Sequence, residues 1–253
     1  MTKDYLRLLT RWRKEHEENY ARILMDPPVP TTMLKAIPFP SVAIIMGDKG
    51  SGKSGVAHAR AEMEHKKTGR LAVLHLPTAS KNVQKDIRKL IPPWMTITTR
   101  RQEWPNDCTV LYDEASQSAH ARRSQTGEAL ELDNLIGISR QRNQLILFIS
   151  HHSRKLDKNA VTDSGLVLWK RPTYAHVLFE REELHDFVMK AFDFFQAIKN
   201  EKQQKRTTLC MDFRTFHFTT FTNDLATYWS HELSCLFERI KNTKTAGSLF
   251  KGE

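Results

Sequence analysis

The sequence predicts an α/β fold in which helices cover both faces of a mainly parallel central sheet. Short apolar runs alternate with helical segments between residues 41 and 150, which is the pattern of successive strand–helix–strand units. A glycine-rich turn at residues 47–52 connects the first of these strands to a helix, and polar residues follow several of the apolar runs. In a parallel sheet such polar residues gather at one edge, where ligands bind.

The first 30 residues are expected to form an appendage. Apolar residues recur at helical spacing from Tyr5 to Trp12 and predict an amphipathic helix over residues 4–25. The proline-rich run Asp26–Pro30 then predicts the end of this helix and a stiff linker, because proline cannot continue a helix. A core domain is therefore expected over residues 31–200.

The core domain contains the strands and helices of the predicted sheet. Apolar runs predict buried strands, because both faces of a parallel sheet are covered. In chain order these strands are Ser41–Met46, Leu71–Leu76, Trp94–Thr99, Cys108–Tyr112, Leu145–Ile149, Gly165–Trp169 and Ala175–Phe179. Helical periodicity predicts helices over 53–67, 79–90, 127–139 and 182–200.

The last part of the chain, residues 201–253, has a different pattern. Lys199–Arg206 is polar and basic and is predicted to be a connector. Phenylalanines alternate with polar residues within Cys210–Phe221, and Leu225–Ile240 has helical periodicity. We therefore expect a small C-terminal α+β subdomain or extension.

The composition excludes several classes of protein. Hydrophobic residues make up 40% of the 253 residues, which is enough for a folded core. The longest apolar runs are far shorter than the about 20 residues that a membrane-spanning helix needs, so no integral membrane segment is expected. The N-terminus has no signal-peptide hydrophobic region, and the three cysteines are too scattered for a disulfide framework. We therefore expect an intracellular protein that is not secreted.

The charge balance favours a polyanionic partner. Lysine and arginine total 39 against 29 acidic residues, which gives a net charge of +10. Between Arg60 and Arg101 the sequence contains ten basic and three acidic residues. A local field of this size favours nucleic acid, and the alternative is a basic surface without a partner.

One short motif predicts nucleotide binding. Gly47-Asp48-Lys49-Gly50-Ser51-Gly52-Lys53-Ser54 matches the pattern G-x-x-x-x-G-K-[ST] at every fixed position. The glycines let backbone N–H groups point at phosphate oxygens, and the following helix adds the positive end of its dipole. Lys53 is expected to reach the β- and γ-phosphates, and the Ser54 hydroxyl to ligate Mg²⁺. The alternative, an ordinary glycine-rich turn, does not explain the strand before the motif and the helix after it.

Two carboxylates follow the predicted strand Cys108–Tyr112. Asp113 is expected to hold Mg²⁺ through water, and Glu114 to polarise the attacking water. A switch GTPase does not normally have the second acid, and the sequence contains no guanine-reading N-K-x-D motif. ATP is therefore the predicted nucleotide. The alternative is that the two acids form only a solvated strand end.

The strand Leu145–Ile149 also ends in polar residues. In the additional-strand class of P-loop ATPases, such a strand lies between the P-loop strand and the acidic strand, and its last polar residue senses the γ-phosphate. Ser150 and His151 are the candidates for this sensor. Arg140 or Arg142, before the strand, is a candidate for completing the site of a neighbouring subunit and stabilising transition-state charge. Alternatively, these arginines bind DNA phosphates or lie on a solvated face.

The run from Arg140 to Asp157 resembles the FtsK/HerA superfamily of P-loop ATPases. It contains an arginine, a small turn, an apolar strand, a polar terminus and then Ser153-Arg154-Lys155-Leu156-Asp157. Members of that superfamily have an arginine eleven residues before a polar sensor, usually glutamine, and Arg140 has this spacing from His151. The resemblance covers residues 40–180, and the histidine is a departure from it. The small size is most similar to the genome-packaging ATPases of membrane-containing icosahedral viruses.

The resemblance implies an additional-strand, RecA-like P-loop NTPase that hydrolyses ATP with Mg²⁺ and moves double-stranded DNA through a pentameric or hexameric ring. It also implies a capsid or portal-vertex protein as a partner, and the host-cell cytoplasm or the virion as the location. Basic residues near the site are expected to track DNA phosphates without reading bases. These residues are Lys81, Lys85, Arg88, Lys89, Arg100, Arg101, Arg122 and Arg123.

Two other functions stay open on the sequence alone. A nucleotide-gated assembly or secretion protein, similar to the zonula occludens toxin-like phage proteins, would use ATP to set a conformational state. Its partner would be a coat or secretion protein. A helicase-type replication ATPase would prefer single strands or forks.

Overall fold

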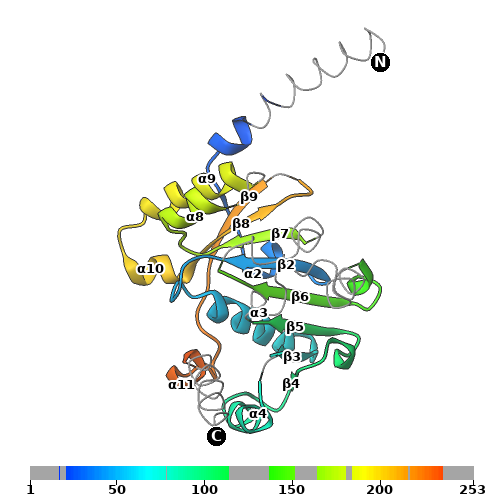
Figure 1. Ribbon diagram of the computed structural model, residues 1–253. Helices are drawn as coiled ribbons and strands as arrows, with labels where there is room; N and C mark the ends of the chain where they lie inside the picture. The colour runs from blue at the N-terminus through cyan, green and yellow to red at the C-terminus, as the bar shows by residue number, and fades with distance from the viewer. Residues whose placement is uncertain are drawn as a thin grey trace, which may run out of the picture.

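A computed structural model describes residues 17, 21–77, 79–113, 137–151, 164–180, 184–215 and 217–235 of the chain. Its strands form one sheet in the order β1-β9-β8-β7-β2-β6-β5-β3-β4. Helices lie on both sides of this sheet (Figure 1). The predicted α/β fold with a mainly parallel sheet is therefore confirmed.

The centre of the sheet consists of parallel strands that are buried on both faces. They are β2 (Ser41–Met46), β3 (Leu71–His75), β4 (Met95–Thr98), β5 (Cys108–Tyr112), β6 (Gln144–Ile149) and β7 (Gly165–Trp169). The strands predicted for these segments agree with the observed ones to within one residue at each end. The agreement follows from their composition, because continuous apolar runs are typical of doubly covered strands.

The β7 edge of this parallel region is extended by a hairpin. β8 (Thr207–Asp212) pairs antiparallel with β7 and with β9 (His217–Thr222), and β1 (Val29–Pro30) pairs with β9. The described part of the C-terminal region is therefore an extension that continues the core sheet. Val29 and Pro30, predicted as part of a linker, join the sheet at its outer edge.

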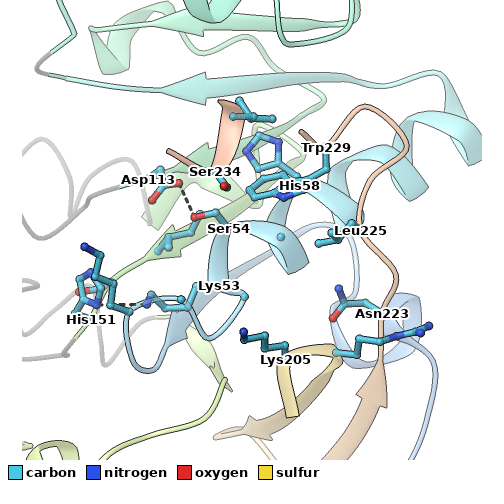
Figure 2. A pocket seen from close by; sticks show the side chains of 18 of the residues that line it. Lys53, Ser54, His58, Asp113, His151, Lys205, Asn223, Leu225, Trp229 and Ser234 are labelled. Carbon is cyan, nitrogen blue, oxygen red and sulfur yellow. Dashed lines mark hydrogen bonds between the residues drawn. The ribbon is translucent and has the colours of Figure 1, made fainter. Parts of the chain in front are cut away.

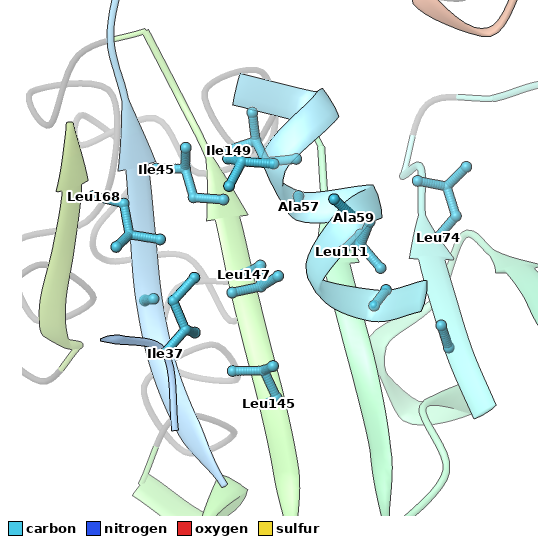
Figure 3. Close-up of a cluster of buried hydrophobic side chains, with 14 of the residues drawn as sticks. Ile37, Ile45, Ala57, Ala59, Leu74, Leu111, Leu145, Leu147, Ile149 and Leu168 are labelled. Carbon is cyan, nitrogen blue, oxygen red and sulfur yellow. The ribbon is translucent and has the colours of Figure 1, made fainter. Parts of the chain in front are cut away.

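One face of the sheet is covered mainly by α3 (Lys53–Thr68), together with α2 (Met33–Ala36) and α4 (Lys81–Arg88). Figure 3 shows Ala57 and Ala59 of α3 facing apolar side chains of the strands. Alanine side chains allow a helix to lie close to a sheet. The helix that begins at the glycine-rich loop is thus fixed firmly to the strands beneath it.

The opposite face is covered by α9 (His185–Gln196). Phe187, Val188 and Phe195 of this helix are buried in the same apolar cluster as Ile44 and Phe148 of the strands. Burial of such side chains stabilises the fold by about 1.5–3 kcal/mol each. The apolar side chains of the helix predicted over residues 182–200 are therefore used for packing within the chain.

Three predictions of local structure are wrong. Ala175–Phe179 was expected to be a strand but lies in the helix α8 (Tyr174–Phe179), which begins with a capping box between Thr173 and His176. The basic connector 199–206 contains the helix α10 (Glu201–Arg206), capped by the Asn200 side chain. Within the predicted helix 225–240, only α11 (His231–Ser234) is helical among the described residues.

Some predictions fall largely outside the described residues. Of the predicted helix 4–25, the described residues are 17 and 21–25, which are helical. Of the predicted helix 127–139, only 137–139 are described, and they are helical too. Glu114, Arg122 and Arg123 also lie outside the described residues. Within the described part of the chain, no helix has the length and apolarity needed to cross a bilayer.

Candidate functional site

The glycine-rich loop lies at the carboxyl end of β2 and leads into α3. Gly47 and Gly52 have backbone φ angles of 140° and 96°, in the left-handed region that favours glycine. A Cβ atom on Gly47 would lie 2.7 Å from the Lys170 carbonyl oxygen, and one on Gly52 would lie 2.9 Å from the Lys205 carbonyl oxygen. The loop therefore needs glycine at both positions, for its conformation and for close packing on the backbone behind it.

Lys53, the first residue of α3, directs its side chain back to this loop. Its Nζ atom donates hydrogen bonds to the carbonyl oxygens of Gly47, at 2.9 Å, and Asp48, at 2.7 Å. The side chain is 7% exposed, so the ammonium group is held inside the loop instead of extending into solvent. Lys53 is the lysine of the motif, the residue that contacts the β- and γ-phosphates in P-loop proteins.

Ser54 and Asp113 meet at the carboxyl edge of the sheet. The Ser54 hydroxyl, in the first turn of α3, donates to the Asp113 carboxylate at 2.9 Å (Figure 2). Asp113 directly follows β5 and is buried. Two adjacent hard oxygen ligands fit Mg²⁺, which usually takes one or two carboxylates and fills its other positions with water and phosphate. Among the described residues no cluster of three or more acidic, histidine or cysteine ligands occurs.

β6 lies between β2 and β5, as expected for the additional-strand class. Ser150, at its end, is buried, and its backbone N–H donates to the Ile45 carbonyl of β2. The next residue, His151, places its Nδ1 atom 3.3 Å from Lys53 Nζ. Of the two predicted sensor candidates, His151 is the one whose side chain reaches the lysine.

A second histidine holds His151 in place. His176 of α8 donates from Nε2 to the His151 carbonyl oxygen at 2.7 Å, and its Nδ1 accepts from the Thr173 backbone N–H at 3.1 Å. Burial is the main cause that lowers the pKa of His176, so the ring is neutral at pH 7 and its tautomer is set by these two bonds. This contact was not predicted, because His176 lies in the segment that was expected to be a strand.

Lys170 supports the loop from behind and was also missed from the sequence. Its side chain is fully buried, and Nζ donates to the carbonyl oxygens of Lys205 and Thr207, both at 2.7 Å. Burial lowers the pKa of this amine to about 7. Lys170 thus connects the end of β7 to the end of α10 directly beneath Gly47 and Gly52. The sequence feature that could have identified Lys170 is its position immediately after a buried strand.

The loop opens into a cavity of about 550 Å³, a size typical of small-ligand sites. Lys53, Ser54, Asp113 and His151 line one part of it. Other parts of its wall come from α10, which includes Lys205, and from the chain after β9, which includes Asn223, Leu225 and Trp229. This C-terminal wall was not predicted as part of the site.

The two candidate arginines lie at the opposite edge of the sheet, before β6. Arg142 donates from Nε to Asn106 Oδ1 at 2.9 Å and from NH2 to the Trp104 carbonyl oxygen. Arg140 is exposed, and among the described residues its side chain has no hydrogen bond or ion pair. Arg142 therefore has a structural role within the chain, and Arg140 is the better candidate for a contact with another molecule.

The predicted DNA-contact residues are only partly on the surface. Lys81, Lys85, Arg88, Lys89 and Arg100 are exposed, and the first four lie on or next to α4. Arg101 was predicted as a DNA contact, but its side chain is buried and donates to the Tyr112 hydroxyl at 3.1 Å. That prediction is wrong because the short 3₁₀-helix Arg101–Glu103 turns the guanidinium inward.

No protein-family model and no curated protein matches the chain. Among solved structures, it is similar to the DNA-packaging ATPase B204 from Sulfolobus Turreted Icosahedral Virus, at 12% identity and a TM-score of 0.52. That match covers 74% of this chain and 98% of the other. The genome packaging NTPase B204 from Sulfolobus turreted icosahedral virus 2, in complex with AMPPCP, matches with the same identity, coverage and TM-score. The chain therefore has the P-loop NTPase fold that these packaging ATPases share.

Proposed function

We propose that this protein is an ATP-driven motor that moves double-stranded DNA during viral genome packaging. The observation that supports this best is that Lys53, Ser54, Asp113 and His151 meet at one edge of the sheet. The fold that holds them is similar to that of the B204 packaging ATPases. The net charge of +10 adds support, because a DNA motor must bind a polyanion. The motor would act in the host cytoplasm or on the virion.

The chain's own residues have separate tasks in ATP hydrolysis. The backbone N–H groups of residues 47–52 would hold the phosphates, and Lys53 would move from the loop carbonyls to the β- and γ-phosphates. Ser54 and Asp113 would hold Mg²⁺, which neutralises charge on the phosphate oxygens when it is bound. Glu114 would accept a proton from the attacking water, and His151 would contact the γ-phosphate.

The position of Arg140 supports an active site shared between subunits. β6 separates this arginine from His151, and six strand residues at about 3.3 Å each span about 20 Å. Arg140 therefore cannot reach the ATP bound to its own chain. In a ring, the exposed arginine of one subunit would approach the γ-phosphate of the next, where it stabilises transition-state charge.

The first test of the proposal is steady-state ATP hydrolysis at low salt, alone and with long linear duplex or single-stranded DNA. We expect duplex DNA to stimulate hydrolysis and single strands to have little effect. Raising the salt from about 50 to 200 mM should remove the stimulation, because phosphate contacts weaken steeply with salt. Equal or stronger stimulation by single strands would contradict the proposal and favour a helicase-type ATPase. No response to either DNA would favour a nucleotide-gated assembly protein.

A further inference from the structure

A buried lysine lies behind the glycine-rich loop. Lys170 directly follows β7, and its backbone N–H donates to the Met46 carbonyl oxygen at 2.8 Å. Its side chain runs beneath the loop, where a Cβ atom on Gly52 would lie 3.3 Å from Lys170 Cε and 3.7 Å from Nζ. Lys170 is not among the residues that line the cavity, so it does not touch a nucleotide bound there. Its effect on a nucleotide therefore passes through the loop.

The Nζ atom of Lys170 has oxygen partners that suit two protonation states. The carbonyl oxygens of Lys205 and Thr207 lie at 2.7 Å, and the Thr208 hydroxyl lies at 3.3 Å. Lys205 is near the end of α10, beside the loop (Figure 2). A neutral amine donates to the two carbonyls and accepts from the hydroxyl, whereas an ammonium group donates to all three oxygens. The same partners thus hold either form without a movement of the side chain.

Among the described residues no carboxylate pairs with Lys170 to fix its charge. Burial lowers the pKa of this amine to about 7, so about half of the molecules carry the charge at pH 7. The charged side chains on the elements around it have other partners, in ion pairs or at the loop carbonyls. They are Asp48 and Lys53 of the loop, Arg171 beside Lys170, and Lys205 and Arg206 of α10.

A bound triphosphate would change the balance between the two forms of Lys170. It would place several negative charges on the loop directly in front of the amine, and a buried charge is screened less than one in water. A nearby anion favours the charged form of an amine and so raises its pKa. The nitrogen lone pair would take a proton from solvent, and the Thr208 hydroxyl would turn from donor to acceptor.

We propose that Lys170 takes up a proton from solvent when a nucleoside triphosphate binds, and that its ammonium charge then stabilises the phosphates from behind the loop. The inference rests on the proposed binding of ATP at this loop and adds a second cation to Lys53. Because binding takes up a proton, the affinity for the nucleotide falls as the pH rises above 7. Below about pH 6 the amine is charged in both states and adds no pH dependence. Lys170 is a positioning residue and takes no part in breaking the phosphate bond.

Isothermal titration calorimetry measures this uptake directly. ATPγS with saturating Mg²⁺ is titrated into the wild-type protein at pH 7 in PIPES, MOPS and imidazole buffers, which absorb different heats when they lose a proton. The thiophosphate of ATPγS is fully ionised at this pH, so the ligand adds no proton change of its own. We expect an uptake of about 0.5 proton per nucleotide, because about half of the Lys170 side chains are neutral before binding.

Three variants assign the proton to Lys170. Lys170→Met keeps the length of the side chain and should show no uptake. Its affinity at pH 6 should be about tenfold lower for each unit by which the nucleotide raises the pKa of the lysine. Lys202→Met makes the same change at an exposed position of α10 and should behave like the wild type. If Lys170→Met does not fold, Thr208→Val removes the acceptor of the third N–H group and should move the largest uptake to lower pH.

The outcomes separate the inference from the proposed function. Equal binding enthalpies of the wild type in the three buffers would overturn the role of Lys170 while leaving nucleotide binding intact. Uptake that persists in Lys170→Met would also overturn it, and loss of that uptake in His151→Gln would assign the proton to the histidine beside Lys53. If the folded wild type shows no saturable binding in any buffer, the proposed function itself fails.

Discussion

Replacing Lys53 by alanine is expected to lower kcat for ATP hydrolysis by about 10²–10³-fold, the usual effect of removing one charge-stabilising donor from an active site. The ammonium group of Lys53 is held at the carbonyl oxygens of the glycine-rich loop, at 2.7 and 2.9 Å. Its removal takes away the cation that stabilises charge on the phosphates. Steady-state hydrolysis measured with a coupled assay gives the rate.

The fold should survive this substitution. The hydrogen bonds of Lys53 to Gly47 and Asp48 are local to the loop, whereas α3 is fixed to the sheet by its buried apolar face. Lys67→Ala, in the exposed last turn of the same helix, is the matched control and should hydrolyse ATP like the wild type. Wild-type hydrolysis by a folded Lys53→Ala protein would show that the active site is elsewhere.

Replacing Arg140 by alanine is expected to inactivate ATP hydrolysis. Mixing this variant with a second inactive variant should restore activity. Loss of an arginine that acts on a neighbouring site lowers kcat by about 10³–10⁵-fold. Glu114→Gln should also be inactive, because the attacking water lacks its base. Mixing the two creates interfaces in which one subunit supplies Glu114 and its neighbour supplies Arg140. Hydrolysis by the mixture should therefore exceed that of either variant alone.

Two neighbouring substitutions define how this result is interpreted. Gln141→Ala changes the next residue, which is also exposed, and should have no effect on hydrolysis. Arg142→Ala removes the bonds to Asn106 and Trp104, so it should lower the free energy of unfolding and should not be rescued by mixing. If mixing does not restore hydrolysis to Arg140→Ala, the site is not shared through this arginine.

The central strands and the loop could be predicted because their signals are local. β2, β5 and β6 are continuous apolar runs followed by polar residues, so composition alone identifies both the strand and the edge that binds ligands. α8 was missed because its helical state depends on one cap. The apolar run Val177–Phe179 is typical of a strand. The capping box between Thr173 and His176, which starts the helix, is visible only in the structure.

The rest of the site depends on contacts between distant parts of the chain. Lys170 reaches the backbone of residues 205 and 207, and Asn223 lies beside the cavity only because β8 and β9 extend the sheet past β7. No spacing in the sequence brings these residues to the glycine-rich loop. Arg101 was predicted as a DNA contact because it lies in a basic segment. In the structure its side chain is buried against Tyr112 and does not face solvent.

Displacement of a third strand from duplex DNA tests the proposed motor most directly. A triplex-forming oligonucleotide bound to a long duplex is released when a translocase moves along that duplex. We expect release with ATP and Mg²⁺, and none with a non-hydrolysable ATP analogue or with Lys53→Ala. Hydrolysis of ATP in the presence of duplex, with the third strand left in place, would contradict DNA translocation as the function of this protein.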